Sequence, residues 1–291
     1  MSPTPKERLT PWLFVAPSVL VFLVVAAYPI GYAVWLSLRR VIIVFHEDRF
    51  VGLQNFAFLL RDPRFWTALG NTAYFSFVAV SIEIVLGLAF ALLLNTAFPG
   101  KKLLRASILV PWAIPTVVSA KTWAWLFNPD YGLVTKLLPG HDIDWLGMPG
   151  YAMHAAIVVD VWKTTPFVAL LLLAGLTGIP DDVYRAAAID GASTFRTFRS
   201  ITLPLLRPTI VVTLVFRTLD AFRVFDAVYV LTGGGPANTT ETLSIYAYKM
   251  LVRVGDFGYG SALAVVTFFC VMAISAGYIR LLGLPGKEES P

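Results

Sequence analysis

The feature that most constrains this chain is a run without a single charged residue from Pro11 to Leu38. An α-helix needs roughly 20 apolar residues to cross the hydrocarbon core of a bilayer, whereas the apolar region of a signal peptide is only about 7–15 residues long. The run is therefore predicted to remain in the protein as a membrane span. The composition agrees, because 57% of the residues are hydrophobic, 14% are charged and the mean hydropathy is +0.72. Too few polar groups remain for a solvated surface, so an all-α integral membrane protein is expected.

Five further apolar stretches predict six transmembrane helices within one membrane domain, residues 1–291. Each stretch is bounded by charges or by clusters of Pro, Gly and Asn. The later spans are expected at Trp66–Thr96, Leu103–Phe127, His154–Thr177, Thr209–Thr232 and Phe257–Leu282. Six crossings put both termini on one side of the membrane. A small excess of Lys and Arg on that side predicts that the termini are cytoplasmic.

Three segments between the spans have a distinct composition. Segment 39–66 mixes large apolar side chains with Arg and Asp, which predicts a short amphipathic helix lying on the membrane interface. Segments 128–153 and 233–236 are rich in Gly and Pro, so we expect irregular backbone there. Lipid excludes such backbone, and these two segments should therefore lie outside the membrane or around a cavity.

Several kinds of site are absent from the sequence. Cys270 is the only cysteine, which excludes an internal disulfide and a cysteine zinc site. The three histidines have no ligand spacing, and no nucleophile motif is present, so neither a metal site nor a catalytic residue is expected. No Gly-x-x-x-x-Gly-Lys-Ser/Thr loop occurs, so the chain has no phosphate-binding loop of its own. The chain has no basic cluster interleaved with aromatics, and nucleic acid is therefore not an expected partner.

The segment between the fourth and fifth spans has the pattern of a docking element. Pro180 should end the preceding helix, and Asp181 or Asp182 can cap a short helix that runs from Val183 to Ile189. Gly191 then permits a left-handed turn and the close approach of a partner. A second helix should follow and break at Pro204.

This segment resembles the EAA signature of the permease subunits of ABC importers. In that signature Glu-Ala-Ala is followed after three residues by Gly, and after nine more by Ile-x-Leu-Pro. The spacing is kept here, but Arg185 stands where the family has Glu, so an ion pair of that Glu with an ATPase arginine cannot form. The resemblance implies a type I importer fold in which 180–204 forms cytoplasmic coupling helices seated in an ATPase. The residues it assigns to ATPase coupling are Arg185, Ala186, Ala187, Asp190, Gly191, Ala192, Phe195, Ile201, Leu203 and Pro204.

Four other segments resemble the carbohydrate branch of this family, the permeases for maltose, trehalose and glycerol phosphate. They are Phe50–Phe56, Phe65 with Asn71–Thr72, Trp162 with Pro166–Phe167, and Leu231–Leu243, and they occur in the order of the family. The resemblance implies a subunit of an importer for trehalose, maltose or a related oligosaccharide, in a prokaryotic inner or plasma membrane. It also implies as partners a second, homologous permease, two ATP-binding cassette ATPases and an extracytoplasmic sugar-binding protein.

Charged residues inside the predicted spans are costly in lipid and usually face a cavity, a partner or a substrate route. The proposed substrate path combines such charges with neighbouring polar, aromatic and small residues in spans four and five. It consists of Asp160, Trp162, Lys163, Thr164, Phe167, Arg217, Asp220, Ala221 and Val224. The spans around Trp162–Pro166 and the middle of span five are where the resemblance places sugar. The charges could instead neutralise one another or join neighbouring helices. Glu83, Lys121, Arg223 and Asp226 are assigned no role.

One other class of transporter fits the same composition. An ion-coupled secondary transporter of a small polar solute would use the membrane charges as relays. No internal repeat is evident, which counts against the common secondary-transporter architectures. Uptake that survives without an ATPase would support this alternative.

Overall fold

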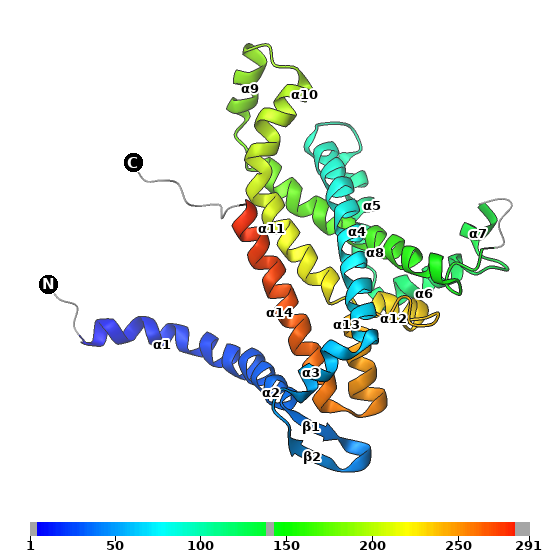
Figure 1. The fold of residues 1–291 in the computed structure, drawn as a ribbon. Helices are drawn as coiled ribbons and strands as arrows, with labels where there is room; N and C mark the ends of the chain where they lie inside the picture. Colours follow the sequence, from blue (N-terminus) through cyan, green and yellow to red (C-terminus); the bar gives the residue numbers. More distant parts are fainter. Residues whose placement is uncertain (1–4, 138–142, 283–291) are drawn as a thin grey trace. The chain divides into compact units, whose positions relative to one another are not determined.

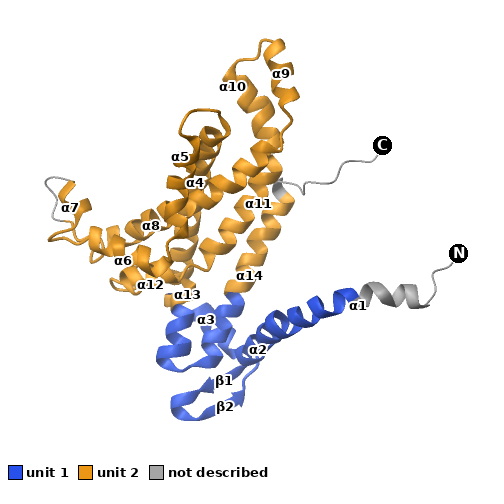
Figure 2. Ribbon diagram, turned by 180° about the vertical axis from the view of Figure 1, so that it is seen from behind, with its two compact units in different colours: residues 1–63, 246–266 blue, residues 64–245, 267–291 orange. Residues whose placement is uncertain are grey.

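The computed structural model describes residues 5–137 and 143–282 and is almost entirely helical. The chain divides into two compact units, one formed by residues 1–63 and 246–266 and the other by residues 64–245 and 267–291 (Figure 2). Part of the predicted outer loop 128–153 lies outside the described residues. Within the described residues, five helices are long and apolar enough to cross a membrane, or six when one sharply bent pair is counted as a span.

The first unit begins with the predicted first span. It consists of α1 (Pro5–Phe22), a π-helical turn at Leu23–Ala27, and α2 (Tyr28–Ser37). No side chain from Phe14 to Leu36 is buried. An uncharged helical stretch with this degree of exposure is suited to a lipid or protein environment rather than to water.

Segment 39–66 contains a short helix, as predicted, in its second half, and a β-hairpin that was not predicted precedes it. β1 (Arg39–Ile42) and β2 (Glu47–Phe50) form an antiparallel hairpin, and α3 (Gln54–Arg61) follows. Charges pair across the strands, with Arg39 Nη2 2.8 Å from an Asp48 carboxylate oxygen and Arg40 Nε 3.0 Å from one of Glu47. These cross-strand pairs and the β-branched residues favour the hairpin over one long helix.

The second unit contains most of the predicted spans. Its helices are α4 (Pro63–Asn95, whose first residue belongs to the first unit), α5 (Lys101–Ala113), α6 (Thr116–Leu126), α7 (Leu133–Leu137), α8 (Pro149–Thr177), α9 (Asp181–Ile189), α10 (Thr194–Thr197), α11 (Leu203–Phe222) and α12 (Asp226–Thr232). α13 (Leu243–Tyr248) and α14 (Phe257–Leu282) each contribute residues to both units. The predicted third span, Leu103–Phe127, is not one straight helix, because α5 and α6 meet at an angle of 94°.

The core of the second unit lies between α4, α8 and their neighbours (Figure 1). Small residues allow the two long helices to approach closely. A Cβ atom at Gly87 of α4 would lie only 2.9 Å from the Cβ of Val168 on α8, so glycine is required at this crossing.

The segment Leu231–Leu243 is irregular at Gly233–Pro236, as predicted, and it is fixed by α4. Asn71 Nδ2 donates to the backbone carbonyls of Asn238 and Glu241, and the Thr72 hydroxyl accepts the N–H of Leu243 at 2.9 Å. Hydrogen bonds from α4 therefore hold a segment that lies far from it in the sequence.

Candidate functional site

The second unit contains a cavity of about 740 Å³ between two interrupted helices and α8. One wall is residues 112–116, where α5 gives way to α6, and another is residues 223–227, where α11 gives way to α12. The volume lies within the range of roughly 300–1,000 Å³ typical of small-molecule sites. The cavity is the natural candidate for a ligand site in this unit.

The break between α5 and α6 is caused by proline. Pro115 has no N–H to donate to the carbonyl four residues earlier, and it disfavours the helical conformation of the residue before it. Ile114 is accordingly extended, with φ −74° and ψ 134°. The break exposes backbone polar groups to the cavity, as occurs where interrupted helices line a binding site in a membrane protein.

The break between α11 and α12 has a different cause, since no Pro or Gly lies within it. α11 ends at Phe222 and α12 begins at Asp226. The carbonyl of Val224, which the interruption frees, accepts a hydrogen bond of 3.1 Å from the hydroxyl of Thr242, a fully buried residue. A contact between segments distant in sequence therefore stabilises this break.

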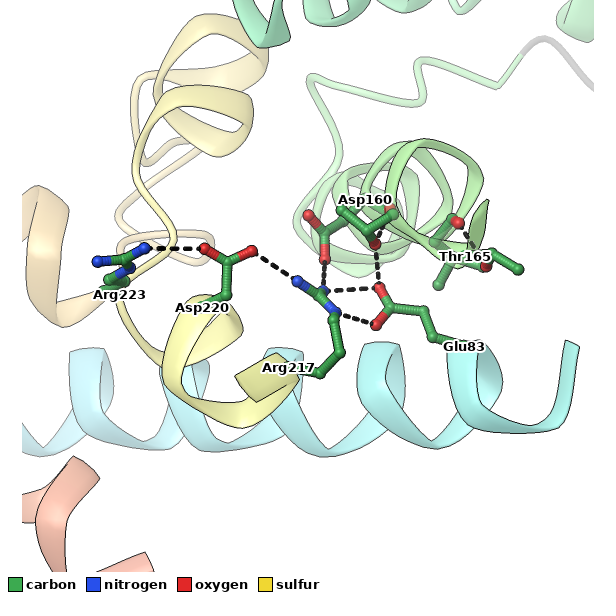
Figure 3. A network of polar contacts seen from close by, with 8 residues as sticks. Glu83, Asp160, Thr165, Arg217, Asp220 and Arg223 are labelled. Atoms are coloured by element: carbon green, nitrogen blue, oxygen red, sulfur yellow. Dashed lines mark hydrogen bonds and ion pairs between the residues drawn. The ribbon is translucent and has the colours of Figure 1, made fainter. Parts of the chain in front are cut away.

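Arg217 is the centre of a buried ionic network that joins three helices (Figure 3). Only 1% of this residue is exposed, and its guanidinium forms a bidentate pair with Glu83 of α4 at 2.6 and 2.8 Å. It also donates to Asp160 of α8 at 3.1 Å and to Asp220 of α11 at 2.6 Å. The planar fork of arginine suits such bidentate binding. Arg217 therefore ties α4, α8 and α11 together.

Asp160 and Asp220 link this network to the cavity, because both line its wall. The Asp220 side chain is about half exposed and also accepts a 3.3 Å hydrogen bond from Arg223. Thr164, also at the wall, has its hydroxyl 2.5 Å from a Glu83 oxygen and 2.6 Å from the Asp160 carbonyl. The cavity thus presents carboxylates whose positions are set by a buried cation.

The predicted substrate-path residues fall into two groups. The group at the cavity wall is Asp160, Lys163, Thr164, Asp220 and Val224. The remaining four lie elsewhere: Arg217 behind the carboxylates, Ala221 in the core, Trp162 against Trp123 with ring centroids 5.6 Å apart, and Phe167 against Trp112. All of the α8 members lie on one continuous helix from Pro149 to Thr177, which includes Pro166.

Sequence reasoning missed five residues of the site. Glu83, which it left without a role, is the bidentate partner of Arg217, and Arg223 and Asp226 are wall residues. Phe225 and Trp112 supply the aromatic rings of the wall in place of Trp162 and Phe167. The pairing of Glu83 with Arg217 has no local signal, since 134 positions separate the two residues.

The segment around Gly191 has the predicted helix–turn–helix form. Gly191 is left-handed with φ +69°, and the N–H of Ala192 donates to the carbonyl of Ala187 at 2.9 Å, which closes α9 with a Schellman motif. Ser193 then caps α10 by accepting the N–H of Arg196. The sequence suggested that Asp181 or Asp182 caps α9, and this is wrong. The N-cap is Pro180, and both aspartates lie in the first turn of the helix.

The prediction that Pro204 breaks the second helix is wrong. α10, a π-helical turn at Phe198–Thr202 and α11 form one continuous helical path from Thr194 to Phe222. In the π turn the N–H of Leu203 donates to the carbonyl of Phe198, five residues earlier. The wider turn accommodates the proline that follows it, because Pro204, which has no N–H to donate, stands directly after the π turn.

Apolar side chains are exposed on both sides of Gly191. Ile189 is 87% exposed and Phe195 is 71% exposed. Arg185, at the position of the usual Glu, is also exposed and lies 3.8 Å from Asp182. The segment therefore offers an apolar surface beside a glycine that has open space around it.

Comparison with known proteins agrees with this architecture. The family model described as "Binding-protein-dependent transport system inner membrane component" matches residues 83–283. The chain belongs to this family. Its role is therefore transport rather than catalysis, and it is a membrane protein with several spans.

Members of the family with similar sequences cover nearly the whole chain. The trehalose/maltose transport system permease protein MalF of Thermococcus litoralis is 46% identical over 279 residues, covering 95% of this chain and 94% of that protein. The trehalose transport system permease protein SugA of Mycobacterium tuberculosis is 45% identical over 287 residues, covering 98% and 92%. A bacterial ABC transporter that imports the acidic polysaccharide alginate has a chain with a TM-score of 0.82 at 21% identity, covering 95% of this chain and 96% of that one. This likeness confirms the expected importer permease fold.

Proposed function

We propose that the chain is the transmembrane permease subunit of an ATP-driven importer of trehalose, maltose or a related oligosaccharide, which works by alternating access. The observation that carries the proposal is the cavity beside Arg217, taken together with relatives named for trehalose and maltose that match nearly the whole chain. We propose the cavity as the sugar-binding site, because the groups at its wall suit a sugar.

A sugar presents hydroxyl donors and an apolar ring face. Asp160 and Asp220 offer carboxylate acceptors at the wall, and Asp226 adds a third carboxylate at the start of α12. Trp112 and Phe225 provide aromatic surfaces on the two helix breaks. Hydrogen-bond acceptors combined with aromatic platforms are the groups that such a ligand requires.

The test is sugar-stimulated ATPase activity and uptake by the complete transporter in proteoliposomes, with trehalose, maltose and glycerol 3-phosphate compared. We expect stimulation by a disaccharide, and Asp226→Asn should raise its half-saturating concentration. Asp130→Asn is the matched control, because Asp130 is exposed on the connection after α6, outside the cavity wall. Uptake that persists with an ATPase unable to hydrolyse ATP would refute the proposal in favour of ion coupling.

The proposal includes the partners and the orientation. The Gly191 segment faces the cytoplasm and docks one of two ATPases, which bind ATP and magnesium, and both termini are cytoplasmic in a prokaryotic inner or plasma membrane. A second, homologous permease completes the pore, and an extracytoplasmic binding protein delivers the sugar. The exposed Ile189 and Phe195 support the docking surface, since apolar side chains so exposed on a turn need a partner.

Docking and orientation have separate tests. Phe195→Ser should reduce co-purification of the ATPase, whereas Phe45→Ser should not, because Phe45 is equally exposed, at 76%, but lies at the hairpin tip. For orientation, Ser193→Cys in a Cys270→Ser background, expressed without the ATPase so that the segment is uncovered, should react with a membrane-impermeant maleimide only in inside-out vesicles. Labelling of intact cells at this position would overturn the assignment.

A further inference from the structure

The break between α5 and α6 is held from the side by two residues of α8. Lys163 Nζ lies 2.5 Å from the backbone carbonyl oxygen of Ile114 and 3.5 Å from that of Trp112. One turn further along α8, the ring of Phe167 stacks on Trp112 with centroids 5.9 Å apart and planes 18° from parallel. Residues four apart share one face of a helix, so both contacts act on the same short segment.

The backbone at the break needs such a contact. In an unbroken helix the carbonyls of Trp112 and Ile114 would accept N–H groups four residues later, and the 94° bend removes these partners. A carbonyl that has lost its N–H partner gains from another donor, and a cation at the C-terminal end of a helix is favourable. The ammonium group of Lys163 meets both needs.

The same geometry restricts what Lys163 can do at the cavity. Its amino group is bonded to backbone carbonyls, while Phe167 lies outside the wall and packs on Trp112. The segment that they hold, residues 112–116, is itself cavity wall. A shift of this segment would alter the shape of the site without removing any side chain from it.

We infer that Lys163 and Phe167 form a latch that fixes the break between α5 and α6, so that Lys163 is a positioning residue for the cavity wall and not a sugar ligand. The latch itself follows from contacts within this chain. Only its effect on transport rests on the proposed function.

The first test measures the break directly. Ala113 is exposed at the cavity wall, and Ala113→Cys in a Cys270→Ser background reports access to the segment when the complete transporter is treated with a small cationic thiol reagent. Lys163→Met, which keeps the apolar stem, should accelerate labelling about tenfold, because hydrogen bonds from a charged donor are among the stronger ones. Lys163→Arg retains the donors and should restore the parent rate.

A matched control separates the latch from the loss of a positive charge. Lys121→Met removes an exposed lysine of α6 that does not line the cavity, and it should leave the labelling rate unchanged. Phe167→Leu should accelerate labelling without any change of charge. If Lys163→Met does not assemble, Lys163→Leu, which also has no donor, replaces it. Equal labelling in the parent and in Lys163→Met or Lys163→Leu would overturn the inference.

The second test measures transport by the same variants. Lys163→Met should raise the half-saturating sugar concentration several-fold while the maximal rate stays within about twofold, and Lys163→Arg should restore both, since uniform loss of binding changes KM and not kcat. A purely structural defect would instead lower the amount of assembled transporter. If labelling changes as expected but the parent chain transports no sugar, the proposed function fails and the latch stands.

Discussion

Removing Arg217 should be the most damaging single change in the second unit. Arg217 is 1% exposed, and its guanidinium donates four hydrogen bonds to three carboxylates, of which Glu83 is fully buried. Breaking a buried ion pair by deleting one partner costs about 3–5 kcal/mol, because the other charge is left uncompensated. With 1 kcal/mol equivalent to about 2–4 °C for a chain of this size, Arg217→Met should lower the melting temperature by about 6–20 °C.

The assay is tryptophan-fluorescence melting of the complete transporter in detergent. Arg223→Met is the matched control: its side chain is 74% exposed, its one bond to Asp220 is 3.3 Å long, and the cost should stay below about 1 kcal/mol. Combining Glu83→Gln with Arg217→Met should recover part of the loss, since one buried charge is then removed. Equal melting temperatures for Arg217→Met and Arg223→Met would refute the reasoning.

Three further changes test other parts of the structure. Gly87→Ala should destabilise the transporter by about 1–3 kcal/mol in the same melting assay, because its Cβ would overlap Val168, whereas Gly70→Ala in the same helix meets nothing within 4 Å and should be neutral or stabilising. Gly191→Trp should abolish ATPase co-purification, while the free energy of unfolding of the permease falls by only about 1–2 kcal/mol. That cost is the strain of a side chain at φ +69°, because nothing lies within 4 Å of the added Cβ. Arg185→Ala should leave the melting temperature within about 1 °C of the parent, because its pair with Asp182 is exposed and 3.8 Å long; a larger fall would mean that Arg185 supports α9.

Long apolar runs made much of the fold predictable. α14 covers the residues of the last predicted span, Phe257–Leu282, and α8 ends at the predicted Thr177. The 94° bend was not predicted, because Pro111 and Pro115 stand in an apolar stretch whose composition is that of one span. The hairpin at 39–50 was also missed, since its stability comes from pairing across strands, whereas the amphipathic pattern alone suggested a helix.

The residues of the site that could be predicted are those whose charge is unusual within a membrane span. Asp160 and Asp220 attract attention because carboxylates are rare in spans. The sequence could not show that Arg217 lies behind them, since its partner Glu83 belongs to a helix 134 positions away. The interruption before Asp226 depends on the hydroxyl of Thr242, which no local pattern connects to it.

The continuous path from Thr194 to Phe222 makes the length of this part of the chain critical. At 1.5 Å per residue, about 35 Å of helix separates Thr194 from Arg217, so a tilt of the whole path by about 5° displaces one end by about 3 Å relative to the other. One residue inserted into this helical path would turn Arg217 by about 100° away from Glu83. Surface connections tolerate insertions, but this stretch should admit none. The number of residues between the turn at Gly191 and Arg217 sets the direction in which the Arg217 side chain points relative to that turn.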